Sequence, residues 1–239
     1  MKTGKSSAKA KLILISNHIA CQEDTPNRSQ KVLKEADLIV FESEKSARQV
    51  LKYFKITRSF LIFSEHNETD SLDLIISAWG QNKTIAYMSD QGCPSLEDPG
   101  KELTSLAFSY KVTLEIIPGP SALTAALAAC PFQAKSFLFA GFLPRKEKER
   151  TEKLKELKEK NELTFLMETP YRLAQVLESC QKVFGDSRQA FLALNASSSN
   201  ETYVAASLKE LSKKYSSEKK SLFVLALNSK EKSKKPRYR

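Results

Sequence analysis

The residues best suited to chemistry lie in one long loop, residues 88–100. The loop follows an apolar run at residues 84–87 and precedes a helical pattern at residues 102–108, which predicts that it leaves the carboxyl end of a strand. It contains two Gly, two Pro and two Asp. Open α/β sheets bind ligands at this edge, and glycine lets a ligand approach the backbone closely. We therefore expect a ligand site here.

A second loop, Pro-Gly-Pro-Ser at residues 118–121, also follows a predicted strand and opens a helix. Free amides at a helix start suit a carboxylate or phosphate, although an ordinary strand-to-helix turn has the same composition. No Gly-x-Gly-x-x-Gly follows the first strand, and the Walker lysine loop is absent from the sequence. These absences argue against a dinucleotide dehydrogenase or a P-loop NTPase. The pattern favours a ligand with a negative end and an apolar body.

Two α/β domains are predicted from the alternation of apolar runs and helical patterns. Five strand-helix units fill the first half, with strands expected at residues 12–15, 38–41, 60–63, 84–88 and 112–117. The regular alternation of strands and helices ends near residue 132. After it, strands are expected at residues 136–142, 163–168, 188–194, 203–206 and 221–227. We predict a mostly parallel sheet in residues 11–132 and a mixed sheet in residues 133–228. Basic tails at residues 1–10 and 229–239 flank them.

The charge of the chain is concentrated in its two ends. The net charge is +10, but residues 229–239 carry six Lys and Arg against one Glu, and residues 1–11 carry four Lys with no acid. About +1 remains for the rest of the chain. Such tails favour electrostatic binding to RNA, although solvated ends would have the same composition.

Composition indicates a cytoplasmic protein without a metal site. The four cysteines are widely separated, which fits neither zinc spacing nor a disulfide framework. No apolar run approaches the length of a membrane span. The basic start and the apolar residues 12–15 imitate a lipoprotein signal, but residues 16–18, Ser-Asn-His, break the apolar segment, which favours a first strand.

Several motifs resemble those of a known family. They are Ser-Glu-His-Asn-Glu at residues 64–68, Ser-Asp-Gln-Gly-Cys-Pro at 89–94, Asp-Pro-Gly at 98–100, Ile-Pro-Gly-Pro-Ser-Ala at 117–122, Gly-Phe-Leu-Pro-Arg-Lys at 141–146 and Glu-Thr-Pro-Tyr-Arg at 168–172. In this order they resemble the tetrapyrrole methylase superfamily of S-adenosylmethionine-dependent methyltransferases. Within it, the chain is most similar to the ribosomal RNA small subunit methyltransferase I group. The loop at residues 16–21 differs from that group's Pro-Thr-Pro-Ile-Gly-Asn, which indicates a divergent branch.

The resemblance implies an α/β fold of two domains with the S-adenosylmethionine cleft between them, usually in a homodimer. It also implies which residues contact the cofactor. In the first domain these are Asp90, Gly92 and Pro94, and from the second loop Ser121 and Ala122. Met167 and Glu168 are expected to approach the adenosine, partly through backbone groups.

The acceptor implied by the resemblance is a cytidine ribose in small-subunit ribosomal RNA, methylated at its 2′-hydroxyl. Candidates for the group that takes the hydroxyl proton are Glu65, His66 and Glu68, although this segment could instead cap the following helix. His18 could be catalytic, structural or a surface residue. Arg145 and Lys146, with Lys148 and Arg150, are expected to bind phosphates, although the helix they begin could be a solvated charged face. Two alternatives are methylation of a small molecule such as a tetrapyrrole, and a cofactor- or RNA-binding relic without turnover.

Overall fold

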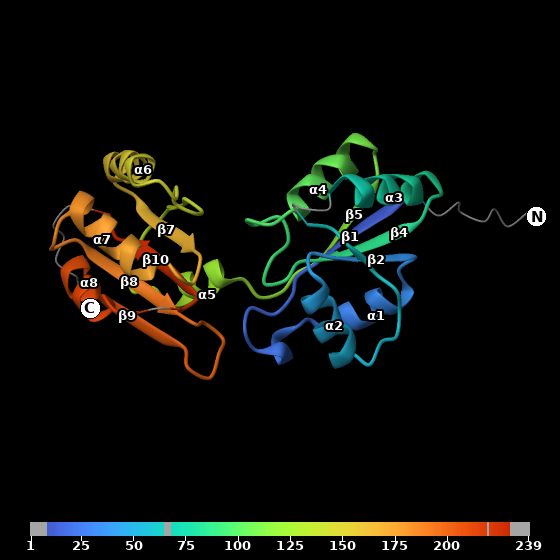
Figure 1. Ribbon diagram of the computed structural model, residues 1–239, viewed down its shortest axis with the longest axis horizontal. Helices are drawn as coiled ribbons and strands as arrows, with labels where there is room; N and C mark the ends of the chain where they lie inside the picture. Colours follow the sequence, from blue (N-terminus) through green and yellow to red (C-terminus); the bar gives the residue numbers. More distant parts are fainter. Residues whose placement is uncertain (1–8, 65–67, 219, 230–239) are drawn as a thin grey trace, which may run out of the picture. The chain divides into compact units, whose positions relative to one another are not determined.

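The computed structural model describes residues 9–64, 68–218 and 220–229, and it divides into two compact units, Met1–Ser121 and Ala122–Arg239. In the first unit, strands and helices alternate along the chain (Figure 1). Its elements are β1 (Lys11–Ile15), η1 (Gln22–Asp24), α1 (Asn27–Glu35), β2 (Leu38–Phe41), α2 (Glu44–Tyr53), β3 (Leu61–Ile62), α3 (Glu68–Gly80), β4 (Thr84–Met88), α4 (Gly100–Ser109) and β5 (Thr113–Ile117).

The first sheet is parallel, with the strand order β3-β2-β4-β1-β5. Its register brings the carboxyl ends of four strands to the same level. Ile15 at the end of β1 pairs with Met88 of β4 on one side and with Ile117 of β5 on the other, and Met88 also pairs with Phe41 of β2. The loops that leave these four strands are therefore neighbours at one edge of the sheet.

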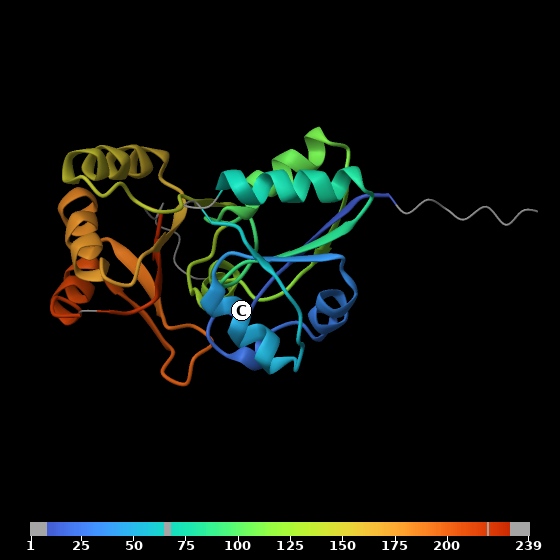
Figure 2. The ribbon, with the colours of Figure 1, turned by 45° about the vertical axis from the view of Figure 1, so that its right-hand side comes forward.

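Helices cover both faces of this sheet, α1 and α2 on one and α3 and α4 on the other (Figure 2). The side chains of β1 alternate between these two faces, which explains why both faces are covered. Ile13 and Ile15 pack with the core under α1 and α2, whereas Leu12 and Leu14 pack with the core under α3 and α4. Because successive side chains of a strand point to opposite faces, an all-apolar strand needs both faces covered. The predicted parallel α/β unit is confirmed.

The second unit holds a mixed sheet of strand order β6-β7-β10-β8-β9, in which only the β6–β7 pair is parallel. One face packs against α6, α7 and α8, and the other against α5 (Figure 1). Its elements are α5 (Ala122–Ala129), β6 (Phe137–Phe139), α6 (Glu147–Lys160), β7 (Leu163–Glu168), α7 (Leu173–Phe184), β8 (Gln189–Leu194), β9 (Thr202–Ser207), α8 (Leu208–Lys214) and β10 (Phe223–Leu227).

The division between the units and the ends of several strands differ from the sequence-based expectation. The division between the units falls after Ser121, not near residue 132, because α5 packs on the second sheet through Ala126. The strand expected at residues 136–142 is shorter, since β6 ends at Phe139 and Gly141 adopts a positive φ of 64°. Among the described residues, no helix is long and apolar enough to span a membrane.

Candidate active site

Four loops at the carboxyl edge of the first sheet contact one another, and Asn17 is the residue that links two of them. Its side chain is 0% exposed. The amide nitrogen Nδ2 donates to the carbonyl oxygens of Ser89, at 3.1 Å, and Asp90, at 2.9 Å, and Oδ1 accepts from the amide of His18 at 2.9 Å. Nδ2 also lies 3.3 Å from Oγ of Ser46 in α2. The loop after β1 is therefore fixed to the loop after β4.

The carboxylate of Asp90 is oriented by the loop after β2. The hydroxyl of Ser43 donates to Oδ1 of Asp90 at 2.8 Å, and the Asp90 amide donates to Oε2 of Glu42 at 2.9 Å. Ser43 is also the N-cap of α2, where its oxygen accepts from the amide of Ser46. Asp90 remains half-buried. A carboxylate held in this way can accept hydrogen bonds from a ligand or stabilise a cation.

Gly92 forms the turn at the centre of this edge. Its φ of 70° favours glycine, and a Cβ there would lie 3.4 Å from Cγ2 of Ile19. The Gly92 amide donates to the His18 carbonyl at 3.2 Å, and the Gly92 carbonyl accepts from the Asn17 amide at 2.9 Å. Pro94 is buried behind this turn. A side chain at position 92 would therefore disturb two loops at once.

The loop after β5 lies against the loop after β1. The amide of Ser16 donates to the carbonyl of Ile117 at 3.0 Å. At Gly119, a Cβ would come within 2.8 Å of Cγ of Pro26 and 2.9 Å of Cβ of Ser16, distances too short for a side chain. Ser121, at the end of this loop, is half-buried. Asp90, Gly92 and Ser121 thus belong to loops that share one edge of the first sheet.

Asp98 holds the second half of the long loop in a conformation that includes two non-glycine residues with positive φ, Ser95 and Glu97. Its Oδ1 accepts from the amides of Ser95, at 2.9 Å, and Gly100, at 2.7 Å. Oδ2 is buried without a hydrogen-bond partner in the described part of the chain. Burial raises the pKa of the Asp98 carboxyl, while the two amides lower it by less.

This pKa predicts a pH effect on stability. Because the fold favours the neutral Asp98 carboxyl, its contribution is fully present below the ordinary pKa of 3.8 and is lost as pH rises through the folded-state pKa. Asp98→Asn keeps an acceptor for the two amides but does not ionise. We expect the unfolding free energy of the wild type, measured by urea denaturation, to fall relative to this variant as pH rises through that window. A difference that is independent of pH would contradict the assignment.

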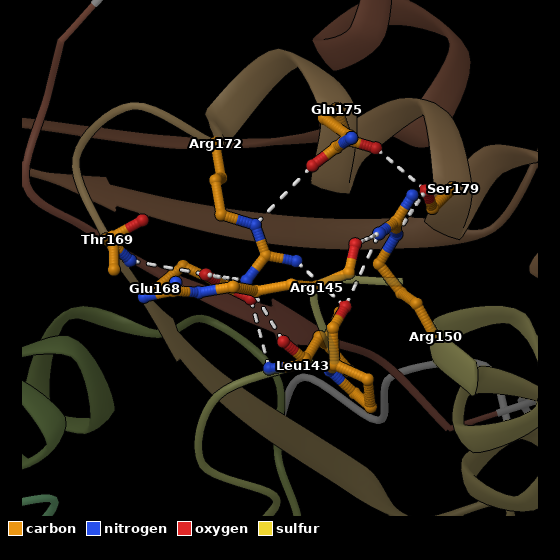
Figure 3. Close-up of polar contacts among 9 residues, drawn as sticks. Leu143, Arg145, Arg150, Glu168, Thr169, Arg172, Gln175 and Ser179 are labelled. Carbon is orange, nitrogen blue, oxygen red and sulfur yellow. Dashed lines mark hydrogen bonds and ion pairs between the residues drawn. The ribbon is translucent and has the colours of Figure 1, made fainter. Parts of the chain in front are cut away.

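In the second unit, the carboxylate of Glu168 binds the loop after β6 rather than facing solvent (Figure 3). Its side chain is 0% exposed. Oε1 accepts from the amide of Leu143 at 3.0 Å, and Oε2 accepts from Arg172 at 2.9 Å and from the amide of Thr169 at 3.2 Å. Burial raises the pKa of the Glu168 carboxyl, opposed by the Leu143 amide and Arg172. Its neighbour Met167 is half-buried, and the Met167 amide donates to the carbonyl oxygen of Gly141 at 3.2 Å.

Two arginines complete the hold on this loop, residues 141–146 (Figure 3). Arg172 donates to the carbonyls of Leu143, at 2.9 Å, and Pro144, at 3.0 Å. Arg150 donates to the carbonyls of Pro144, at 3.3 Å, and Arg145, at 2.8 Å, and to Oγ of Ser179 at 3.0 Å. Three successive carbonyls are therefore bound by guanidinium groups, which fixes the path of the backbone.

The basic residues expected to bind phosphate divide into two groups. Arg145, Lys146 and Lys148 are exposed, and Lys146 makes a surface ion pair with Glu149 at 3.0 Å. Arg150 is only 3% exposed, and its guanidinium is used inside the protein. The prediction that Arg150 belongs to the phosphate-binding surface is therefore wrong. Its spacing along α6 places it on the face that packs against α7.

The candidate proton acceptors Glu65 and His66 lie outside the described residues. Glu68 begins α3, but its side chain is also outside the described part. The two basic tails are largely outside it as well. Within residues 9–64, 68–218 and 220–229, no group of three or more His, Cys, Asp and Glu side chains is arranged to hold a metal ion.

Comparison with known proteins assigns the family. The family described as Tetrapyrrole (Corrin/Porphyrin) Methylases matches residues 11–212. Ribosomal RNA small subunit methyltransferase I of Thermotoga maritima is 36% identical over 183 residues, which are 77% of this chain and 82% of the relative. The protein of the same name from Halalkalibacterium halodurans is 32% identical over 214 residues, 88% of this chain and 74% of the relative.

A solved structure supports the fold independently. Diphthine synthase superposes with a TM-score of 0.72 at 18% identity, covering 92% of this chain and 90% of that one. The family match spans both units, from the first strand of the parallel sheet to α8. The chain therefore belongs to the tetrapyrrole methylase family and is an S-adenosylmethionine-dependent methyltransferase.

Proposed function

We propose that this protein methylates the 2′-hydroxyl of a cytidine ribose in small-subunit ribosomal RNA. The observation that carries the proposal is the carboxyl edge of the first sheet, where Asn17 and Ser43 hold Asp90 and Gly92 in fixed positions. The names of the relatives, which are ribosomal RNA methyltransferases, support RNA as the acceptor. The same names favour the cytoplasm as the place of action and a small ribosomal subunit as the partner.

The residues at this edge fit S-adenosylmethionine. The half-buried Asp90 carboxylate suits ribose hydroxyls or a cationic group, and Gly92 presents backbone without a side chain. When bound, S-adenosylmethionine supplies an electrophilic methyl group together with its leaving group. The protein must then mainly orient the acceptor and exclude water.

We assign cofactor contacts to residues of both units. In the first they are Asp90, Gly92, Pro94 and Ser121. In the second they are Ala122, Met167 and Glu168. Because the Glu168 carboxylate is already hydrogen-bonded to Leu143 and Arg172, Glu168 would contact the cofactor through its backbone. We also propose that the functional form is a homodimer.

The acceptor side of the proposal rests on the loop at residues 141–146. Arg145 and Lys146 project from a backbone that Arg150 and Arg172 hold in place, and the side chain of Lys146 is 81% exposed. Exposed cations on a fixed loop suit the phosphates of RNA, which dominate the affinity of nucleic-acid binding. Glu65, His66 and Glu68 are candidates for the group that takes the proton from the hydroxyl.

A methyl-transfer assay tests this function. Small ribosomal subunits from a strain that lacks this protein would be incubated with the protein and S-adenosylmethionine labelled in its methyl group, and the labelled nucleotide would be mapped. We expect label on one cytidine ribose, and less of it with the double variant Arg145→Ala, Lys146→Ala. Lys153→Ala, at an exposed site on α6, is the control. Label that enters small molecules only would refute the RNA assignment and favour a small-molecule methylase, whereas cofactor binding without transfer would indicate a relic.

A further inference from the structure

His18 is the only histidine among the residues that the structure describes, and it lies at the centre of the candidate site. It follows β1, which is flanked by β4 and β5 at the carboxyl edge of the parallel sheet. Its carbonyl accepts a hydrogen bond from the amide of Gly92, and its amide donates to Oδ1 of Asn17. The position of the imidazole is therefore coupled directly to the turn proposed to contact the cofactor.

The ring of His18 is held at its Nδ1 atom. Nδ1 lies 3.0 Å from Oγ1 of Thr25, and Thr25 is buried and fixed by its own amide, which donates to the carbonyl of Gln22 at 3.1 Å. Nε2 has no hydrogen-bond partner in the part of the chain that the structure describes. His18 is half-buried, so the ring is partly accessible from solvent. An imidazole fixed through Nδ1 with a free Nε2 is the arrangement of a general base.

We propose that Nε2 of His18 accepts the proton of the acceptor hydroxyl during methyl transfer. This role rests on the proposed function, and it is specific to this chain because it uses a side chain of the divergent loop at residues 16–21. Thr25 is a positioning residue: in the tautomer that this role requires, Nδ1–H donates to Oγ1 of Thr25 and the lone pair is on Nε2. Asn17 positions the same residue through its backbone.

The electrostatic environment keeps the ring neutral near pH 7. Burial lowers the pKa of the His18 imidazole from its ordinary value of 6.5, and the carboxylate of Asp24 raises it by less. The other titratable groups on the elements that contact His18 are Cys21 of its own loop, Glu23 of η1, and Asp90, Cys93, Glu97 and Asp98 of the loop after β4. A neutral imidazole can accept a proton, whereas an imidazolium cannot, so activity should be lost as pH falls below this pKa.

The proposed step is balanced. The O–H bond of the acceptor breaks, and its proton moves to Nε2 of His18, while the oxygen forms a bond to the methyl carbon. The electron pair of the broken carbon–sulfur bond stays on the sulfur of the cofactor. The imidazolium then releases its proton to water, which restores the base.

Titration of the two histidines by proton NMR gives a readout that does not depend on turnover. The chain contains only two His, so the signal lost in His18→Asn identifies His18. We expect a pKa below 6.5 for that signal in the wild type. Thr25→Val should change this pKa, because Nδ1 loses its partner, whereas Thr25→Ser should restore it.

Kinetics complete the test, with labelled S-adenosylmethionine and small ribosomal subunits as substrates. His18→Asn keeps a donor for Thr25 but has no base, and we expect it to lower kcat by about 10²–10⁴-fold without changing cofactor affinity. The acidic limb of the wild-type pH–kcat profile should follow the NMR pKa and disappear in the variant. Circular dichroism checks that the variant is folded.

The alternative outcomes are distinguishable. Unchanged kcat in His18→Asn, persistence of the acidic limb, or a fall in cofactor affinity that accounts for the loss of rate would each overturn the role of His18. Loss of the limb in Glu65→Gln or His66→Asn instead would assign the base to that segment. A wild-type protein that binds S-adenosylmethionine but methylates no RNA would refute the proposed function, and the role of His18 with it.

Discussion

Replacing Arg172 with methionine is expected to lower the free energy of unfolding by about 3–5 kcal/mol, because it leaves the buried carboxylate of Glu168 without its charged partner. The Arg172 side chain is 15% exposed and that of Glu168 is 0% exposed, so water cannot readily replace the lost contact. The carbonyls of Leu143 and Pro144 also lose their donor. Urea denaturation of the two proteins measures the change.

An exposed ion pair on another helix provides a matched control. Arg48 binds Glu44 with both side chains well exposed, at 72% and 61%. Arg48→Met should therefore change stability by less than about 1 kcal/mol. A double-mutant cycle between Arg172→Met and Glu168→Gln should show coupling. Without the charge of Glu168, the Arg172→Met substitution no longer leaves a buried carboxylate unpaired, so it should lower the free energy of unfolding by less. Equal effects of Arg172→Met and Arg48→Met would disprove the structural role of Arg172.

The variant Arg172→Met should also weaken RNA binding more than cofactor binding. Arg172 contacts the backbone of the loop that carries Arg145 and Lys146, whereas among the proposed cofactor contacts it binds only the side chain of Glu168, a residue proposed to act through its backbone. Filter binding with small ribosomal subunits and calorimetry with S-adenosylhomocysteine would separate the two affinities.

Asn17→Asp is expected to destabilise the first unit by about 3 kcal/mol or more at neutral pH. The substitution removes the only donors of a fully buried side chain and places a carboxylate beside the carbonyl oxygens of Ser89 and Asp90. Because protonation removes the charge, the loss should be smaller at low pH. Asn17→Ala, which removes the donors without adding a charge, should cost about 1–3 kcal/mol.

The control for this variant is Asn200→Asp in the exposed loop between β8 and β9. Its effect should stay within about 0.5 kcal/mol, as for most surface substitutions. Cofactor affinity should fall in Asn17→Asp even under conditions where the protein is folded, because Asn17 fixes the Asp90 backbone. An Asn17→Asp protein as stable as the control would show that this network does not hold the site.

Much of the fold can be predicted from the sequence, because the pattern that determines it is local. The strands β2, β4 and β7 begin and end at the predicted residues. β2 and β4 are uninterrupted apolar or β-branched runs bounded by polar residues, and β7 is such a run that ends in Glu168. The position of the candidate site follows from the same pattern, because loops after parallel strands meet at one edge.

The domain boundary could not be predicted in this way. Helix α5 consists of Ala, Leu and Thr, so it has no polar face that would show which sheet it covers. Only the packing of Ala126 against the second sheet places α5 in that unit.

The roles of individual polar residues were also hidden, because they depend on contacts between residues far apart in the chain. Asn17 and Asp90 are 73 residues apart, and Arg172 and Leu143 are 29 apart. In the sequence, Asn17 belongs to a loop that merely differs from the family motif, and Arg150 is one cation of a charged helix. The burial of a polar side chain is what distinguishes these residues, and it becomes visible only in the folded chain.

Calorimetric titration with S-adenosylmethionine tests the central claim, that the carboxyl edge of the first sheet binds the cofactor, most directly. The wild type and Gly80→Val should bind with the same affinity, because a Cβ at Gly80 would meet no atom within 4 Å. Gly92→Val should bind without detectable heat, since a branched side chain there is strained at a φ of 70° and approaches Ile19. Binding by Gly92→Val as tight as by the wild type, or the absence of binding by the wild type, would contradict the account.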